Sequence, residues 1–135
     1  AAIRDSSTSR GLGDVYKRQI LFDLLILQKN KMKNLTSKEL IEKLDNDQNG
    51  FLLDVRSEEE YEESNIPNSK LLNIRDPQSF MDGLQDLDKS KNFYVYCHSG
   101  VRSVQACQIM KTFGFNNLYN LLGGISEWTG KKISN

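Results

Sequence analysis

Cys97 is the residue of this chain best placed for nucleophilic chemistry. It opens the segment Cys-His-Ser-Gly-Val-Arg-Ser (97–103), which lies between an aromatic and β-branched run at 93–96 and an amphipathic run that opens at Val104. A cysteine at the junction of a strand and a helix lies near first-turn N–H groups that have no intrahelical partners, and near the positive end of the helix dipole. That position favours an anion, which here is the thiolate of Cys97.

The neighbours of Cys97 favour the same chemistry. A cysteine near a helix N-terminus or a cation ionises below its ordinary pKa of about 8.5, and Arg102 supplies a second positive charge. Gly100 permits backbone angles that let successive N–H groups curl around one anion. The alternative is a buried cysteine at the end of a core strand, which the polar, glycine-containing surroundings disfavour. We therefore expect Cys97 to be the nucleophile of a substrate-binding loop made of His98, Ser99, Gly100, Val101, Arg102 and Ser103.

Four other residues have competing interpretations. His98 is the only histidine, and because consecutive loop residues usually point apart, contact with an anionic substrate is favoured over a role as general base. Cys107 lies about 6 Å along the axis of the expected helix from its start. A role as a small core residue is favoured there over a role as a resolving thiol. Asp54 and Arg56 flank a strand end, where they pair with each other or brace the site, and bracing is favoured.

Composition bounds the class of protein. The chain has 135 residues, of which 38% are hydrophobic, enough for one core and too few for two ordinary domains. Lysine plus arginine equals aspartate plus glutamate at 18 each, so the net basic charge of a sequence-independent nucleic-acid binder is missing. Two cysteines and one histidine provide neither a disulfide framework nor a closed four-ligand zinc site. We expect no metal, no nucleic-acid partner and a reducing compartment, the cytoplasm.

The first 31 residues differ in character from the rest. Residues 1–19 are rich in Ser, Arg and Gly, show no sustained period and resemble translated sequencing-adapter sequence. The apolar stretch 20–27 is too short to cross a bilayer. Asp23 also interrupts the apolar region that a signal peptide would need, so no membrane association is expected. We expect 1–31 to be a non-native or disordered extension before a domain at 32–135, with Met32 as a native start; the alternative is a genuine disordered arm with a short helix from Ile20.

Helix signals recur along the rest of the chain. Thr36 with Glu39 and Ser57 with Glu60 each match a capping box, and Asp76 before Pro77 matches a capped helix start. The acidic side chains at 58–63 complement the helix dipole and are expected to form a solvated face without chemistry. The expected helices are 36–45, 57–63, one that starts at Asp76, and one from Val104 that ends at Gly114 and buries Phe113.

Short apolar runs alternate with these helices and predict strands. The runs lie at 51–55, 71–74, 93–96 and 118–121, and a closing helical turn is expected at 125–128. Strands alternating with helices at this spacing indicate an α/β domain with a mostly parallel central sheet and helices on both faces. Ligands of such folds bind beyond the carboxyl ends of the strands. The Cys97 loop follows one such end.

Residues 34–132 resemble a single-domain rhodanese. The similarity lies in Leu-Asp-Val-Arg at 53–56 with the acidic stretch to Tyr61, Ile66-Pro67, the Cys-x-x-Gly-x-Arg-Ser loop, and Leu-Gly-Gly-Ile at 122–125 with Trp128. The chain departs from the family pattern at 64–65, where Ser-Asn replaces Gly-His, and at 68–69, where Asn-Ser replaces Gly-Ala. The resemblance implies a rhodanese-like fold.

It also implies a sulfurtransferase. The Cys97 thiolate would attack a sulfane-sulfur donor, hold the sulfur as a persulfide and pass it to a thiol or cyanide acceptor, with no cofactor. The donor would be thiosulfate, a low-molecular-weight persulfide or a protein persulfide, and Arg102 would favour an anionic one. Related phosphatases carry one more residue between Cys and Arg, so the four residues here favour sulfur over phosphate. The alternative from another class is a non-catalytic rhodanese module that binds a partner or carries persulfide.

Overall fold

The computed structural model describes residues 18, 20 and 32–134. The interpretation of residues 1–31 as an extension falls almost wholly outside the described residues. Within the described part of the chain, every helix is too short or too polar to cross a lipid bilayer. The account that follows concerns residues 32–134.

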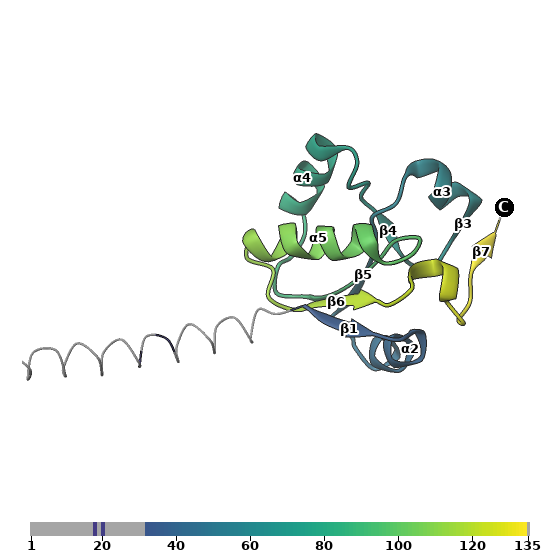
Figure 1. The fold of residues 1–135 in the computed structure, drawn as a ribbon, viewed down its shortest axis with the longest axis horizontal. Coiled ribbons are helices and arrows are strands. Elements are labelled where there is room, and N and C mark those ends of the chain that lie inside the picture. The colour runs from purple at the N-terminus through teal and green to yellow at the C-terminus, as the bar shows by residue number, and fades with distance from the viewer. Residues whose placement is uncertain (1–17, 19, 21–31, 135) are drawn as a thin grey trace, which may run out of the picture. The chain divides into compact units, whose positions relative to one another are not determined.

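Five parallel strands form the central sheet (Figure 1). Their order across the sheet is β1-β6-β5-β2-β4, with β5 in the middle. Phe93 of β5 pairs with Phe51 on one side and Leu118 on the other, and every pairing in this sheet is parallel. The predicted parallel α/β sheet is therefore confirmed. The strands are β1 (Lys33–Leu35), β2 (Gly50–Asp54), β4 (Lys70–Leu71), β5 (Asn92–Tyr96) and β6 (Leu118–Leu121).

Strand β5 is buried on both of its faces because successive side chains point to opposite sides of the sheet. Phe93 and Val95 belong to one hydrophobic cluster, whereas Tyr94 and Tyr96 belong to another. All four side chains are fully buried. The continuous apolar run that predicted this strand is thus explained by two separate layers of core.

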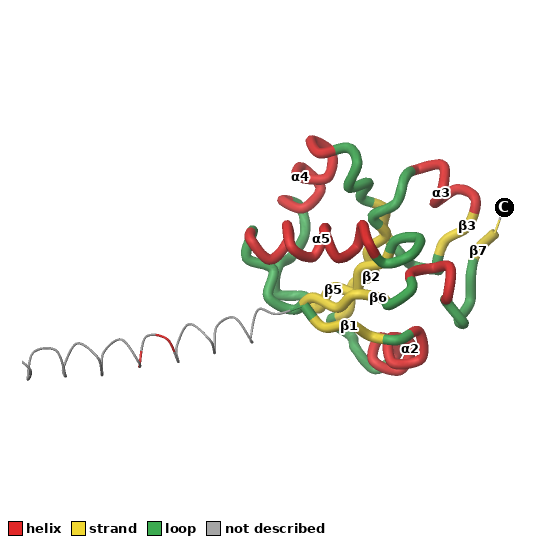
Figure 2. Tube along the Cα trace, viewed as in Figure 1, coloured by secondary structure: helices red, strands yellow, loops and turns green. Residues whose placement is uncertain are grey.

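Helices cover both faces of the sheet, as predicted (Figures 1 and 2). Helix α2 (Ser37–Asp45) packs Leu40 into the cluster of Tyr94 and Tyr96. Helices α4 (Pro77–Gln85) and α5 (Val101–Thr112) pack into the cluster of Phe93 and Val95. The short helix α3 (Glu58–Glu63) follows β2. Both predicted capping boxes are present, at the starts of α2 and α3.

Two expectations about element bounds and one about burial are wrong. The strand expected at 71–74 is only Lys70–Leu71, because the Asn73 side chain accepts the N–H of Arg75 and its carbonyl accepts the N–H of Asp76, which turns the chain. Helix α5 begins at Val101 rather than Val104. Phe113, expected in the buried stripe of that helix, lies beyond its end and is 42% exposed.

A second, two-stranded sheet lies beside the end of the chain. Strand β3 (Ser64–Asn65) pairs antiparallel with β7 (Ile133–Ser134). The 3-10 helix η1 (Gly124–Glu127) precedes it and matches the expected closing turn. Neither the small sheet nor the edge strand β1 was predicted from the sequence. The small sheet joins the segment after α3 to residues 133–134, and β1 pairs with the outer side of β6.

Candidate active site

The Cys97 loop lies at the carboxyl end of the central strand. Cys97 directly follows β5, whose last residue, Tyr96, pairs with Asp54 at the end of β2. Gly100 caps helix α5 with φ of 105°, a left-handed conformation that glycine adopts without steric cost. Because α5 begins at Val101, the expected loop of 97–103 divides into a short turn and the first turn of the helix. Val101, Arg102 and Ser103 therefore lie on the helix.

The sulfur of Cys97 lies among hydrogen-bond donors. The backbone N–H of Gly100 donates to Sγ across 3.0 Å. The hydroxyl oxygen of Ser103 lies 3.5 Å from the same sulfur. The side chain is 1% exposed and also packs in the hydrophobic cluster of Phe93 and Val95, so these donors and apolar side chains, rather than bulk water, surround the thiol. A sulfur held in this way is buried but not sealed among apolar atoms, which is the condition for a stabilised thiolate.

Two opposing effects set the pKa of Cys97. Burial acts to raise the pKa of the thiol, since it penalises the charged form. Hydrogen bonds from the Ser103 hydroxyl and from the backbone N–H groups of Ser103, Gly100 and Ser99 lower it. The hydrogen bonds outweigh burial, and the pKa of Cys97 lies below its ordinary value. The Ser103 hydroxyl, which the sequence did not single out for this role, makes the largest of the contributions that lower the pKa, and the backbone N–H groups at the start of α5 add to it.

Ser103 connects the nucleophile to the edge of the sheet. Its hydroxyl lies within hydrogen-bond distance of Asn120 Oδ1 on β6 and of the Gly100 carbonyl, as well as of the Cys97 sulfur. The amide Nδ2 of Asn120 in turn donates to Asn34 Oδ1 on β1, at 3.0 Å. A hydroxyl has one proton, so the three acceptors around Ser103 compete for it. A negative charge on sulfur would draw that proton, because hydrogen bonds to charged groups are stronger.

The glycine pair 123–124 supports the loop from the outside. The N–H of Ile125 donates to the carbonyl of Cys97 at 2.9 Å, and the N–H of Ser126 donates to the carbonyl of His98 at 3.0 Å. Gly124 has φ of 60°, and a Cβ placed on it would overlap the carbonyl oxygens of Cys97 and His98. The close approach of these two backbone segments requires glycine here. The carbonyls of Cys97 and His98 are thereby bonded to the segment at 125–126.

Arg102 is engaged by a carboxylate from another helix. Its Nη1 and Nη2 donate to Oε1 and Oε2 of Glu60, at 2.7 and 2.9 Å. Glu60 also completes the capping box of α3 by accepting the N–H and hydroxyl of Ser57. The hydrogen bond from Arg102 is the main cause that lowers the pKa of Glu60 to about 2. The arginine is thus held in place at the rim of the loop, with its charge balanced by Glu60.

The family of the chain follows from comparison with known proteins. A family model described as "Rhodanese-like domain" matches residues 36–131. The chain belongs to the rhodanese-like domain family. A crystal structure of a rhodanese-like domain protein from Staphylococcus aureus superposes with a TM-score of 0.64 at 31% identity, covering 74% of this chain and 94% of that one.

Two relatives show the range of proteins that contain such a domain. "Thiosulfate sulfurtransferase GlpE" of Coxiella burnetii is 32% identical over 98 residues, which cover 73% of this chain and 85% of the relative. "Putative sulfur carrier protein YrkF" of Bacillus subtilis is 37% identical over 90 residues. That match covers 67% of this chain and 47% of YrkF, so the chain spans about half the length of that relative.

Asp54 and Arg56 form a buried ion pair beside the rhodanese-like loop. Arg56 Nη2 lies 2.7 Å from Asp54 Oδ2, and the side chains are 3% and 0% exposed. The same nitrogen donates to the carbonyl of Ser64 at 2.6 Å. The two residues therefore pair with each other, and Arg56 also ties the end of β2 to β3. The pairing is therefore observed, and the bracing of the site by these two residues stays a prediction.

The remaining expected residues take different places in the domain. His98 and Arg102 line a cavity of about 330 Å³ beside the loop. Within residues 32–134, no hydrogen bond joins the His98 side chain to Cys97. This agrees with the expected position of His98 at the rim of the site. Val101 is 67% exposed. Cys107 is fully buried, and burial, with a smaller contribution from the charge of Cys97, raises its pKa to about 12; it packs as a core residue.

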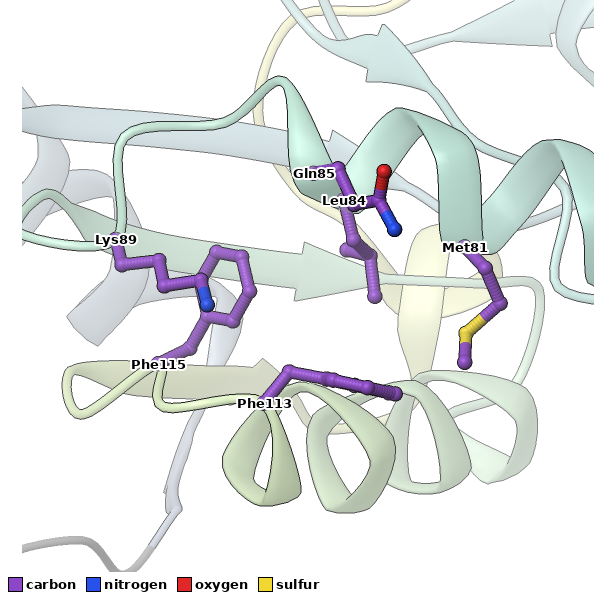
Figure 3. Close-up of a pocket in the computed structure, with 6 residues that line it drawn as sticks. All are labelled: Met81, Leu84, Gln85, Lys89, Phe113 and Phe115. Atoms are coloured by element: carbon purple, nitrogen blue, oxygen red, sulfur yellow. The ribbon is translucent and has the colours of Figure 1, made fainter.

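Figure 3 shows a second, smaller cavity that is lined mainly by apolar side chains. It measures about 50 Å³ and lies between α4 and the residues that follow α5. Since α5 has 12 residues, the end of the helix is about 18 Å from its start. The ammonium of Lys89 lies 5.6 Å from the ring centre of Phe115 and covers this region. None of its lining residues belongs to the Cys97 loop. Its lining residues are Met81, Leu84, Gln85, Lys89, Phe113 and Phe115.

Three residues of the site were not predicted from the sequence. Glu60 was assigned to a solvated face, yet it binds Arg102. Asn120 was assigned to a core strand, although a polar residue between apolar neighbours was a signal of a buried hydrogen bond. Lys132 lines the larger cavity, and nothing in the local sequence indicates that position. Each of the three depends on contacts between segments far apart in the chain.

Proposed function

We propose that this rhodanese-like domain is a sulfurtransferase that moves a sulfane sulfur from a donor to a thiophilic acceptor through a persulfide on Cys97. One observation carries the proposal. The sulfur of Cys97 accepts the Gly100 N–H at 3.0 Å and lies 3.5 Å from the Ser103 hydroxyl, at the start of α5. The hydrogen bonds that lower the pKa of the thiol also suit a persulfide anion one atom further out.

The chemistry takes two displacement steps. In the first, the Cys97 thiolate attacks the outer sulfur of thiosulfate; a new S–S bond forms, the old one breaks, and sulfite leaves with the electron pair. In the second, an acceptor such as cyanide attacks the outer sulfur of the persulfide, so that thiocyanate forms and the Cys97 thiolate returns. No proton needs to be transferred by a protein acid or base in either step. Stabilising negative charge on sulfur is the main task of the site.

We propose chemical classes of donor and acceptor rather than single compounds. Thiosulfate, a low-molecular-weight persulfide and a protein persulfide are the candidate donors, and a thiol or cyanide is the acceptor. The sulfurtransferase among the relatives supports turnover, and the sulfur carrier supports a second candidate, a module that carries persulfide without turning over small molecules. We place the protein in a reducing compartment, the cytoplasm, because the mechanism needs Cys97 as a free thiol.

The test measures thiocyanate formed from thiosulfate and cyanide. Wild-type protein is expected to turn over, and Cys97→Ser is expected to be inactive. Cys107→Ser serves as the matched control and is expected to keep most of the activity, because that thiol is buried and un-ionised. Comparable losses in both variants would indicate a relay between two thiols. Absence of sulfur on Cys97 after incubation with thiosulfate, glutathione persulfide or a cysteine desulfurase would favour the non-catalytic module.

A further inference from the structure

A cavity of about 330 Å³ flanks the Cys97 loop. Four segments contribute to it: the loop with the start of α5, the chain from the end of β2 through α3, the turn η1, and the residues just before β7. Its volume falls at the lower end of the range of about 300–1,000 Å³ in which organic ligands bind. The lining residues are Arg56, Glu60, Glu63, Ser64, His98, Arg102, Ile125, Ser126 and Lys132.

Most of the charge in this cavity is already balanced. Arg56 is paired with Asp54, and Arg102 is paired with Glu60. Both of these arginines therefore have a carboxylate partner within the protein. The charged lining side chains outside both pairs are Lys132 and Glu63, and both residues are exposed. The cavity therefore presents one free ammonium group and one free carboxylate.

The small second sheet places Lys132 in the cavity. Ile133 pairs with Asn65, and Ser134 pairs with Ser64, the residue that follows Glu63 at the end of α3. The backbone pairing thus brings the segments that carry Lys132 and Glu63 together at one wall. The backbone next to each residue is held by this strand pairing, whereas both side chains are exposed.

We propose that this cavity is a subsite for the non-reacting part of a zwitterionic persulfide donor, a persulfide of an amino-acid or peptide thiol, with Lys132 binding its carboxylate and Glu63 its ammonium group. The inference rests on the proposed sulfur transfer and names its donor class. Thiosulfate has five non-hydrogen atoms and only negative charge, so it offers Glu63 no partner. Arg102 is occupied by Glu60, which leaves Lys132 as the cation for an anionic group.

The transfer of sulfur from such a donor to Cys97 is a balanced displacement. The Cys97 thiolate attacks the outer sulfur of R–S–SH and forms Cys97–S–SH. The S–S bond of the donor breaks, and R–S⁻ leaves with the electron pair while the outer sulfur keeps its proton. No oxidant or reductant is consumed. The subsite acts only on binding of R, so its effect belongs in KM more than in kcat.

The test compares kcat/KM for glutathione persulfide, cysteine persulfide, the uncharged 2-hydroxyethyl persulfide and thiosulfate. Lys132→Gln and Glu63→Gln are each expected to lower the ratio of kcat/KM for the two zwitterionic donors over the uncharged one by roughly threefold to fivefold, the effect of losing one exposed ion pair. The loss is expected in KM. A larger effect with glutathione persulfide than with cysteine persulfide would assign the subsite to peptide thiols, and the reverse to amino-acid thiols.

Two variants serve as matched controls. Lys131→Gln removes the same charge one residue away and Glu59→Gln removes one from the same helix, and neither residue lines this cavity. Both are expected to leave the donor ratio unchanged. An unchanged ratio in Lys132→Gln and Glu63→Gln would overturn the subsite while thiosulfate turnover upheld the proposed function. An equal loss of kcat/KM with thiosulfate would also overturn the subsite, because it would show that Lys132 attracts anions in general. Failure of every donor to load Cys97 would overturn both.

Discussion

The guanidinium of Arg102 and the carboxylate of Glu60 share two hydrogen bonds, at 2.7 and 2.9 Å, across 42 positions of sequence. The pair fixes the start of α5 to the start of α3. It also gives the arginine a partner within the protein, so an incoming anion must compete with Glu60 for it. The relation between the two residues therefore affects stability and donor binding together.

Glu60→Gln should destabilise the domain in a pH-dependent way. The bond to Arg102 lowers the pKa of Glu60 from 4.5 to about 2, so its contribution is complete above pH 4.5 and is lost as pH falls through about 2. At neutral pH we expect a loss of about 1 kcal/mol for this partly exposed pair. Urea unfolding at a series of pH values measures it. A gap between wild type and variant that stays constant down to the lowest pH would contradict the assignment.

Ser103→Ala should raise the pKa of Cys97, because the hydroxyl is the largest of the contributions that lower it. The pH dependence of iodoacetamide alkylation reports the titration of the thiol, and its midpoint should move to higher pH. Ser99→Ala is the matched control, since Ser99 acts on the sulfur through its backbone N–H, which the substitution keeps. Equal midpoints in wild type and Ser103→Ala would show that the hydroxyl does not reach the thiolate.

Asp54→Asn should cost about 3–5 kcal/mol of stability, because it leaves the guanidinium of Arg56 buried without its counter-charge. Denaturant unfolding measures the loss. The double variant Asp54→Leu with Arg56→Met removes both charges and should recover part of it. A double variant less stable than Asp54→Asn would mean that the link from Arg56 to Ser64 matters more than the pair itself.

Gly124→Ala should impair both stability and sulfur transfer. Its φ of 60° disfavours any side chain, and the new Cβ would push on the carbonyls of Cys97 and His98. Gly114→Ala is matched to it: φ is 92°, but the nearest atom is 3.9 Å away, on Lys89. Both variants should lose about 1–3 kcal/mol, measured by unfolding, whereas only Gly124→Ala should also lose thiocyanate formation. Equal thiocyanate formation in the two variants would show that Gly124 is not needed to support the Cys97 loop.

Local signals in the sequence predicted the parts of the site that depend on local structure. The two capping boxes, the doubly buried strand before Cys97 and the glycine after it all belong to segments of a few residues, where pattern and propensity decide. The position of Cys97 beyond the end of β5 follows from the parallel sheet. The start of α5 was placed three residues late because Val101 is exposed and Arg102 is polar, so the apolar pattern does not include them.

Contacts between distant segments could not be predicted in the same way. The pairing of β3 with β7 uses two-residue strands about 70 positions apart, and no alternation can show in so short a run. The partners of Ser103 and Arg102 are likewise 17 and 42 positions away. The acidic helix α3 matches a solvated face by composition, and only the fold reveals that Glu60 is turned toward the loop.

The most direct measurement is the mass of the protein after incubation with a sulfane-sulfur donor, followed by peptide mapping without reductant. We expect a gain equal to one sulfur atom, located on the peptide that contains Cys97, and its loss on addition of cyanide or a thiol. Cys107, buried and with its pKa raised to about 12, should stay unmodified. An intact mass that does not change with thiosulfate, glutathione persulfide or a cysteine desulfurase, or a sulfur located on Cys107 alone, would contradict sulfur transfer through Cys97.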